Sequence, residues 1–277
     1  MENEQIQNNV KSGYADIVKR NTKKSFLPNF FQCCDRKEIA TDIGKKIGYS
    51  EEELKNVPED ANLGIGCGNP TALASIKRGE TILDLGSGAG FDCFLASRET
   101  GEKGKVIGVD ITPEMVAKAN KNAKKGNYKN VEFKIGEIEN LPVESDSIDL
   151  IISNCVINLS NQKEQIFKEA FRVIKPNGRI MISDIILLND LPDYVKNSVE
   201  GHIACLAGAV RKEDYINAIT KAGFNEISID KQAPFPIELM LNDPIAEKIV
   251  SENNLTEREI KEIANSIASI SISAIKS

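Results

Sequence analysis

The stretch from Ile82 to Cys93 constrains the fold of this chain more than any other. A short apolar run ends at Asp84, and glycines stand at positions 86, 88 and 90 before a segment that is compatible with a helix. Glycines allow backbone angles that other residues avoid, and the start of a helix offers unpaired N–H donors. The stretch therefore predicts a strand, a tight turn and a helix that together bind a nucleotide-like cofactor.

A second strand is expected over Lys105–Asp110, and it also ends in an acid. Asp110 is placed to accept hydrogen bonds from a ribose diol. The glycines follow the spacing Gly-x-Gly-x-Gly, and Phe91 stands where a dinucleotide fingerprint has its third glycine. This departure argues against NAD, so an NAD-dependent oxidoreductase is a disfavoured alternative.

Strands and helices alternate through the rest of the core. A helix is expected from Pro113 with Thr112 as its N-cap, and the polar first 24 residues predict a surface helix. Further strands are expected at residues 131–135, 147–154, 179–184, 226–230 and 267–275. The last of these alternates strictly and should have one wetter face. This order predicts an α/β fold, a doubly wound Rossmann-like sheet that an antiparallel final strand completes to seven strands.

The composition limits the binding partners and the cellular location that we expect for this protein. The chain has 277 residues and a net charge of −6, which gives no support for binding nucleic acid. No signal peptide and no apolar run of roughly 18 residues is present, so we expect a cytoplasmic protein without a membrane partner. Six cysteines are spread too widely for a disulfide scaffold and should be reduced in the cytosol. They are candidate ligands or nucleophiles.

Three motifs in the core resemble the cofactor motifs of class I S-adenosylmethionine-dependent methyltransferases. They are the glycine stretch from Asp84, the strand end at Gly108–Asp110, and the segment Gly136–Pro142. The resemblance implies that S-adenosylmethionine is the cofactor and that a substrate-binding insertion follows the core. The cofactor-binding residues that it implies are Asp84, Gly86, Ser87, Gly88, Gly90, Asp110, Ile111, Met115, Glu137, Ile138 and Asn154. Asn154 could alternatively cap a turn.

Three further segments resemble the arsenite methyltransferases. They are Gly64–Pro70, Ser153–Leu159 and Cys205–Ala209. The resemblance implies that residues 1–75 form an N-terminal arm with cysteine-bearing loops and that residues 76–190 form the cofactor-binding core. Residues 191–277 would hold the substrate-binding insertion, the last two strands and a C-terminal excursion.

The same resemblance assigns the chemistry to cysteines. Cys67, Cys155 and Cys205 would bind trivalent arsenic, and thiolate suits such a soft centre better than oxygen does. The arsenic lone pair would then attack the sulfonium methyl group, so the substrates would be arsenite or methylated trivalent arsenicals. Cys34 would pair with Cys67 to supply electrons, with Cys33 as its substitute. A small thiol or a thioredoxin-type protein would be the reductant.

The sequence alone leaves other functions open. The chain could methylate carbon or oxygen of a small organic acceptor such as a quinone precursor, or it could bind arsenic without turnover. Cys67 and Cys155 could be ordinary buried or strand-end residues. Cys93 is expected in the core, and His202 is expected to be a packed or surface side chain.

Overall fold

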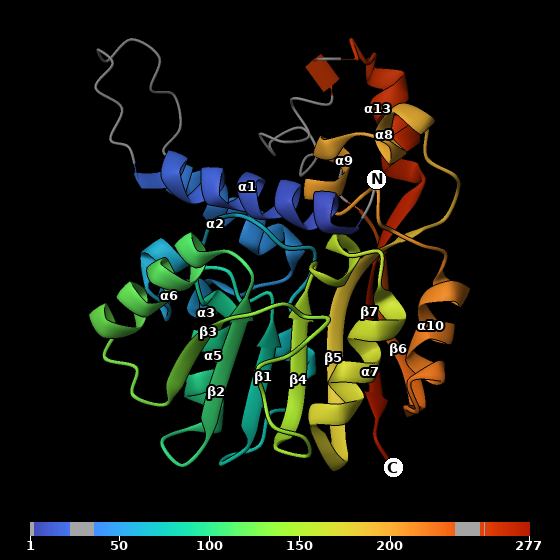
Figure 1. Ribbon diagram of the computed structural model, residues 1–277. Helices are drawn as coiled ribbons and strands as arrows, with labels where there is room; N and C mark the ends of the chain where they lie inside the picture. The colour runs from blue at the N-terminus through green and yellow to red at the C-terminus, as the bar shows by residue number, and fades with distance from the viewer. Residues whose placement is uncertain (1–2, 23–35, 236–249, 252) are drawn as a thin grey trace, which may run out of the picture.

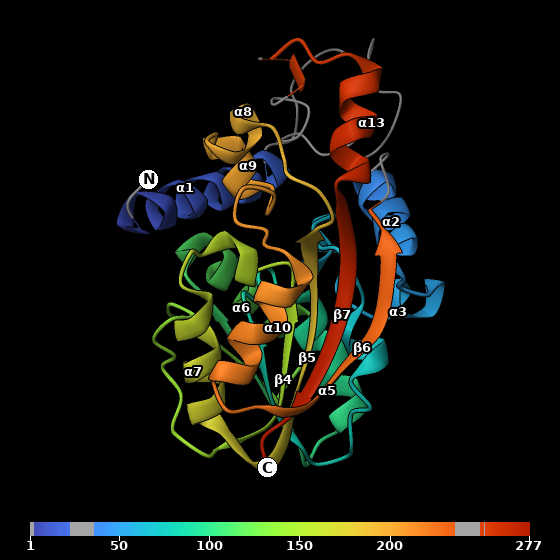
Figure 2. The ribbon, with the colours of Figure 1, turned by 90° about the vertical axis from the view of Figure 1, so that its right-hand side faces the viewer.

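The computed structural model describes residues 3–22, 36–235, 250–251 and 253–277. Its centre is a seven-stranded sheet in the order β3-β2-β1-β4-β5-β7-β6 (Figure 1). The strands are β1 Thr81–Leu85, β2 Lys105–Asp110, β3 Val131–Ile135, β4 Ile148–Asn154, β5 Ile174–Leu187, β6 Asn225–Pro234 and β7 Ile267–Ile275. The first five are parallel to one another, and β7 is inserted antiparallel between β5 and β6 (Figure 2). The predicted fold class is confirmed, and β5 and β6 are longer than expected.

Helices cover both faces of the sheet. They are α1 Asn3–Thr22, α2 Arg36–Ile47, α3 Glu51–Lys55, α4 Pro70–Leu73, α5 Phe91–Thr100, α6 Pro113–Lys125, α7 Lys163–Val173, α8 Asp193–Lys196, α9 Val199–Ile203, α10 Lys212–Lys221 and α13 Glu257–Asn265, with 3-10 turns η1 Glu59–Ala61 and η2 Ile157–Leu159. One core cluster joins the sheet to α7 and α10, and a second joins it to α2, α5 and α6. The central strands are therefore buried on both sides, as their unbroken apolar runs require.

The N-terminal helix is more than the surface helix that its polar sequence predicts. Helix α1 lies across the carboxyl ends of the strands and contacts α6, α9 and η2 (Figure 1). Its own side chains Ile6 and Val10 are buried. Gly13 of the same helix packs so closely on α9 that an added Cβ would lie 2.6 Å from the side chain of Ile203. The helix therefore covers the carboxyl ends of the strands, where ligands of such sheets bind.

The expectation of one wetter face on β7 is confirmed relative to the opposite face, because the partly exposed residues of the strand, Ser269, Ser273 and Ile275, all lie on the serine face. Ser271 is buried and only 4% exposed, while Ser269 and Ser273 are half-buried. The hydroxyl of Ser271 lies 3.2 Å from that of Ser183 on β5, and Ser269 donates to the carbonyl of Cys67 at 2.6 Å. The small polar face of β7 is thus partly covered by the glycine-rich loop that carries Cys67.

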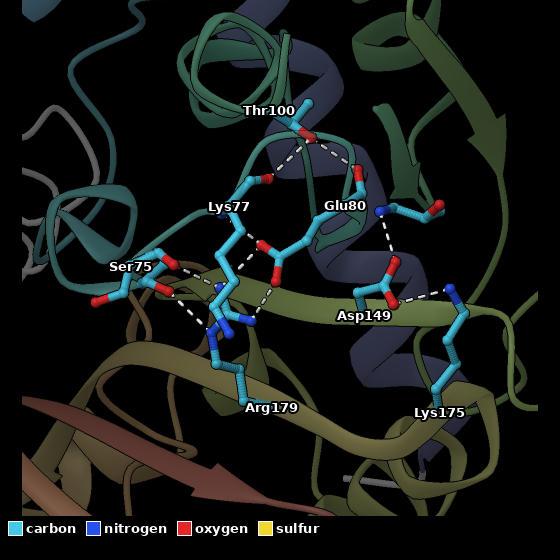
Figure 3. A network of polar contacts seen from close by, with 9 residues as sticks. Ser75, Lys77, Glu80, Thr100, Asp149, Lys175 and Arg179 are labelled. Atoms are coloured by element: carbon cyan, nitrogen blue, oxygen red, sulfur yellow. Dashed lines mark hydrogen bonds and ion pairs between the residues drawn. The ribbon is translucent and has the colours of Figure 1, made fainter. Parts of the chain in front are cut away.

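A polar network ties the opposite edge of the sheet together (Figure 3). Arg179 forms two hydrogen bonds to Glu80, at 2.6 and 3.0 Å, and also donates to the carbonyls of Ala74 and Ser75. Asp149 accepts from Lys175 at 2.8 Å. This network connects β5 to the loop before β1, at the end of the sheet remote from the cysteines.

None of the helices in the described part of the chain combines the length and the apolar character that crossing a bilayer requires.

Candidate functional site

Three cysteines that are far apart in the sequence meet at the carboxyl edge of the sheet. Cys67 lies in the loop before α4, Cys155 follows β4, and Cys205 follows α9. The Sγ atoms of Cys67 and Cys155 and a carboxylate oxygen of Asp184 lie within 4.8 Å of one another. The thiol of Cys205 donates to the carbonyl of Cys155 at 2.8 Å. The fold therefore gathers three sulfurs and one carboxylate.

Backbone strain accompanies two of these cysteines. Cys155 has φ of 58° and Cys205 has φ of 61°, a left-handed conformation that costs a residue with a side chain roughly 1 kcal/mol or more. Such strain persists only where the surrounding structure enforces it, and it is concentrated at functional sites. The chain therefore turns sharply at Cys155 and at Cys205, the two residues that carry these thiols.

Asn154 holds the Cys67 loop against the sheet. Its side-chain oxygen accepts from the Cys67 N–H at 3.0 Å, and its amide nitrogen donates to the Gly68 carbonyl and the Tyr49 hydroxyl, each at 2.9 Å. The Tyr49 hydroxyl donates to Asp92 at 2.6 Å. The last residue of β4 thus connects the cysteine loop with the helix that follows the glycine turn.

Lys163 holds the Cys205 loop in place. Its ammonium group, in a residue only 8% exposed, donates to the carbonyl of Gly208 at 2.6 Å and to that of Ser160 at 3.0 Å. An added Cβ at Gly208 would lie 1.9 Å from the carbonyl oxygen of Asn158. Only a glycine permits this close approach, which brings the loop onto η2.

Asp184 lies beneath the thiols and is fully buried. One carboxylate oxygen accepts from the Asn158 amide at 2.8 Å and from the Ile185 N–H at 2.9 Å. The other accepts from the Tyr215 hydroxyl at 3.0 Å. These donors fix the orientation of the carboxylate at the base of the site.

Burial dominates the electrostatics of the site. It raises the pKa of the Cys67 thiol to about 11 and that of the Asp184 carboxyl to about 6, and it lowers the pKa of the Lys163 ammonium to about 8. The hydrogen bond with Cys155, followed by burial, raises the pKa of Cys205 well above its usual value. The cysteines are therefore protonated at neutral pH until a ligand replaces their protons.

One pocket contains both the thiol edge and the glycine turn. Cys155 and Cys205 lie in its wall, as do Asn154 and the following predicted cofactor residues: Asp84, Gly86, Ser87, Gly88, Asp110, Ile111 and Ile138. Cys67 is 4% exposed and lies behind its neighbour Gly66, which is in the wall. Helix α1 closes the pocket with Gln7, Val10 and Tyr14.

The glycine turn fits a nucleotide-like cofactor. An added Cβ at Gly88 would enter open space with no heavy atom within 4 Å, so the backbone leaves a cradle there. Ser87 has a buried hydroxyl that lacks a partner among the described residues. The Asp110 carboxylate accepts from Gly88 N–H and Thr112 N–H and faces the pocket. These residues would hold S-adenosylmethionine along the sheet edge.

Some predicted residues lie away from the pocket wall. Gly90 caps α5, Met115 is fully buried in α6, and Glu137 is exposed beside the wall residues Ile138 and Glu139. Cys34 and its substitute Cys33 lie outside the described residues, as does the side chain of His202. Cys93 is buried in the core as predicted, and its thiol donates to Asp84 at 3.2 Å.

The sequence analysis did not single out several residues that build the site. Asp184 ends the predicted fifth strand, so the rule that ligands bind at the carboxyl ends of parallel strands could have identified it. Tyr14, Asp92 and Lys163 belong to helices whose placement depends on tertiary packing. Their contribution carries no local signal in the sequence.

The sequence is similar to those of known methyltransferases. A family model described as a methyltransferase domain matches residues 76–223. The arsenite methyltransferase of Halobacterium salinarum is 42% identical over 79% of this chain and 56% of its own length, and the human arsenite methyltransferase is 34% identical over 79% and 58%. The chain thus spans little more than half the length of these curated relatives.

A solved structure extends the likeness to three dimensions. The crystal structure of an arsenic(III) S-adenosylmethionine methyltransferase from Chlamydomonas reinhardtii superposes with a TM-score of 0.59 at 31% identity. The match covers 86% of this chain and 73% of that one. The chain therefore belongs to the methyltransferase-domain family and, within it, to the arsenite methyltransferases.

Proposed function

We propose that this protein transfers the methyl group of S-adenosylmethionine to trivalent arsenic bound by Cys67, Cys155 and Cys205. The observation that carries the proposal is the convergence of these three cysteines, two of which, Cys155 and Cys205, lie in the wall of the pocket that also contains the glycine turn. Relatives named for arsenite methylation support it. A methyltransferase for an organic acceptor would have no use for three thiols at this position.

The cysteines define the reactive form of the substrate. Three thiols replace the three hydroxyls of arsenous acid and leave arsenic with three As–S bonds and a lone pair. Because each thiol proton leaves in a water molecule, the protein needs no strong base. Asn154 and Lys163 hold two of the three thiol-bearing loops and so fix the direction of the lone pair.

The cofactor residues would align the second reactant. When bound, S-adenosylmethionine supplies an electrophilic sulfonium methyl group. We assign Asp110 to the ribose, the glycines at 86, 88 and 90 with Ser87 to the methionine part, and Glu137 with Ile138 to the adenine. Asp84, Ile111, Met115 and Asn154 would support these contacts. Helix α1 would exclude water, and holding both reactants in near-attack geometry can remove several kcal/mol from the barrier.

Electrons for reducing the methylated arsenic would come from a cysteine pair. We assign Cys34 as the partner of Cys67, with a small thiol or a thioredoxin-type protein restoring the pair. Serine at position 34 should therefore slow turnover while leaving arsenite binding in place.

The test is direct. The full chain is incubated with arsenite, a thiol and cofactor carrying a labelled methyl group, and methylated arsenic is separated and quantified. The Cys155→Ser and Cys205→Ser variants should lose most of this product. If the variants keep full activity, or if the label appears only in an organic acceptor, the proposal is wrong.

A further inference from the structure

The thiols share their site with a carboxylate that arsenic methylation leaves without a role. Asp184 places an oxygen within 4.8 Å of the Sγ atoms of Cys67 and Cys155. Trivalent arsenic with three sulfurs is complete as a pyramid and keeps a lone pair, so it needs no oxygen ligand. A buried carboxylate at that position is costly unless it is paired with hydrogen-bond donors or a cation.

We propose that Cys67, Cys155 and Asp184, with Cys205 as a further sulfur, also form a binding site for a thiophilic divalent cation of the zinc or cadmium type. Such ions prefer four ligands in a tetrahedron, with thiolate sulfur and carboxylate oxygen both acceptable. Cys67, Cys155 and Asp184 supply three of these ligands from atoms within 4.8 Å of one another, and the thiol of Cys205, which donates to the Cys155 carbonyl, is the candidate for the fourth. The site therefore serves two chemistries, a three-sulfur one for arsenic and a sulfur–oxygen one for the divalent ion.

The surrounding charge fits a divalent ion. With Cys67 and Cys155 as thiolates, Asp184 as a carboxylate and Cys205 as a neutral thiol, a bound divalent cation is left with one excess negative charge. The ammonium of Lys163, 8% exposed and interacting electrostatically with Asp184 and Cys205, supplies the balancing charge. Beside a neutral arsenic–sulfur complex the same ammonium balances the Asp184 carboxylate alone, so the charge of the site accommodates either ligand.

The carboxylate is also oriented as a metal ligand needs to be. Donors from Asn158, Tyr215 and the Ile185 backbone hold both of its oxygens. Partners of this kind fix a ligand and typically change metal affinity roughly 10–100-fold when they are removed. The oxygen that accepts from Tyr215 keeps a lone pair for a metal ion, whereas the hydrogen bonds from Asn158 and Ile185 use both lone pairs of the other oxygen.

The two ligands would exclude each other. The divalent ion and arsenic use the same sulfurs of Cys67 and Cys155, so one bound cation prevents arsenite from binding. This inference does not depend on arsenic methylation, because it concerns the donor set alone.

Cadmium binding to the full chain tests the proposal. Cys33 and Cys34 are replaced by serine in every protein, so that their sulfurs do not contribute, and cadmium chloride is titrated in equilibrium dialysis. The affinity should fall roughly 10–100-fold in Asp184→Asn. Asp149→Asn is the matched control, since Asp149 lies at the other end of the sheet (Figure 3), and it should bind cadmium as the parent does.

Two further measurements make the result decisive. Cadmium-edge X-ray absorption of the parent protein should show sulfur neighbours and one short oxygen neighbour, and this readout needs no folded Asp184 variant. Arsenite affinity should stay within about threefold in Asp184→Asn, and one equivalent of cadmium should abolish arsenite binding in the parent. A sulfur-only shell, or equal cadmium affinity in Asp184→Asn and parent, would overturn the proposal. A parent that binds cadmium in this way but not arsenite would refute the proposed function alone.

Discussion

Replacing Asn154 by alanine should loosen the Cys67 loop and weaken arsenite binding. The change removes the acceptor of the Cys67 N–H and the donor to the Gly68 carbonyl. Leaving a partly buried backbone group unsatisfied costs about 1–3 kcal/mol, and two lose their partner here, so the free energy of unfolding should fall by about 2–4 kcal/mol. A loop that is no longer held must be ordered when arsenic binds. If that costs about 1.4 kcal/mol, arsenite affinity falls about tenfold.

A matched control separates the local effect from general destabilisation. Asn130 also makes three side-chain hydrogen bonds, to Ser97 and to the carbonyl of Gly101, but it lies outside the pocket wall. Asn130→Ala should lose similar stability and keep the arsenite affinity of the parent. Arsenite affinity is measured by equilibrium dialysis with elemental analysis, and unfolding by circular dichroism in urea. Should both variants bind arsenite equally well, the role given to Asn154 is refuted.

Three other changes have definite expectations. Gly208→Ala places a methyl group against the carbonyl of Asn158, so it should displace the Cys205 loop and reduce the arsenic–sulfur coordination number seen by X-ray absorption from three to two. Arg179→Met removes the ion-pair partner of Glu80, whose side chain is 12% exposed, and leaves it the Lys77 N–H as donor; urea unfolding should show a loss of about 2–3 kcal/mol with unchanged arsenite affinity. Burial raises the pKa of Asp92 to about 6 from 3.8, so its contribution to stability is present below pH 3.8 and is lost as pH rises through 6. The stability of Asp92→Asn relative to the parent should therefore increase by about 2 kcal/mol from pH 4 to 7 in urea titrations, and a pH-independent difference would contradict this.

The sequence was sufficient to predict the sheet because its signals are local. The glycine turn after Asp84, the acid at Asp110 and the apolar run of β4 each specify a strand end or a turn from neighbouring residues. The alternation of β7 correctly predicts which face is wetter, but it does not show what covers part of that face. The cover is the Cys67 loop, whose contact with Ser269 spans 202 positions.

The site was only partly predictable for a similar reason. The three cysteines could be named from a resemblance to a family, but no spacing in the chain brings them together. The residues that hold them, Asn154 for Cys67 and Lys163 for Cys205, act through backbone carbonyls and N–H groups that any sequence possesses. Such contacts become visible only when the fold places the loops.

The number of protons released on binding distinguishes arsenite from cadmium as a ligand of the cysteine site. Arsenous acid is neutral, and it loses one hydroxyl as water for each thiol proton it accepts, so binding to three protonated thiols releases no protons overall. Burial raises the pKa of Cys67 to about 11, which keeps that thiol protonated across the neutral range. Arsenite affinity should therefore change little between pH 6.5 and 8.

A divalent cation brings no base with it, so each thiol that it binds must release a proton to the solvent. Cadmium affinity should consequently rise about a hundredfold per pH unit over the same range when two thiols are ionised, because the raised thiol pKa values lie above it. Dialysis at four pH values with each ligand measures both slopes. A cadmium affinity that does not change with pH, beside an arsenite affinity that falls as pH rises, would mean that the thiols are already ionised in the free protein and that their burial does not control the chemistry of the site.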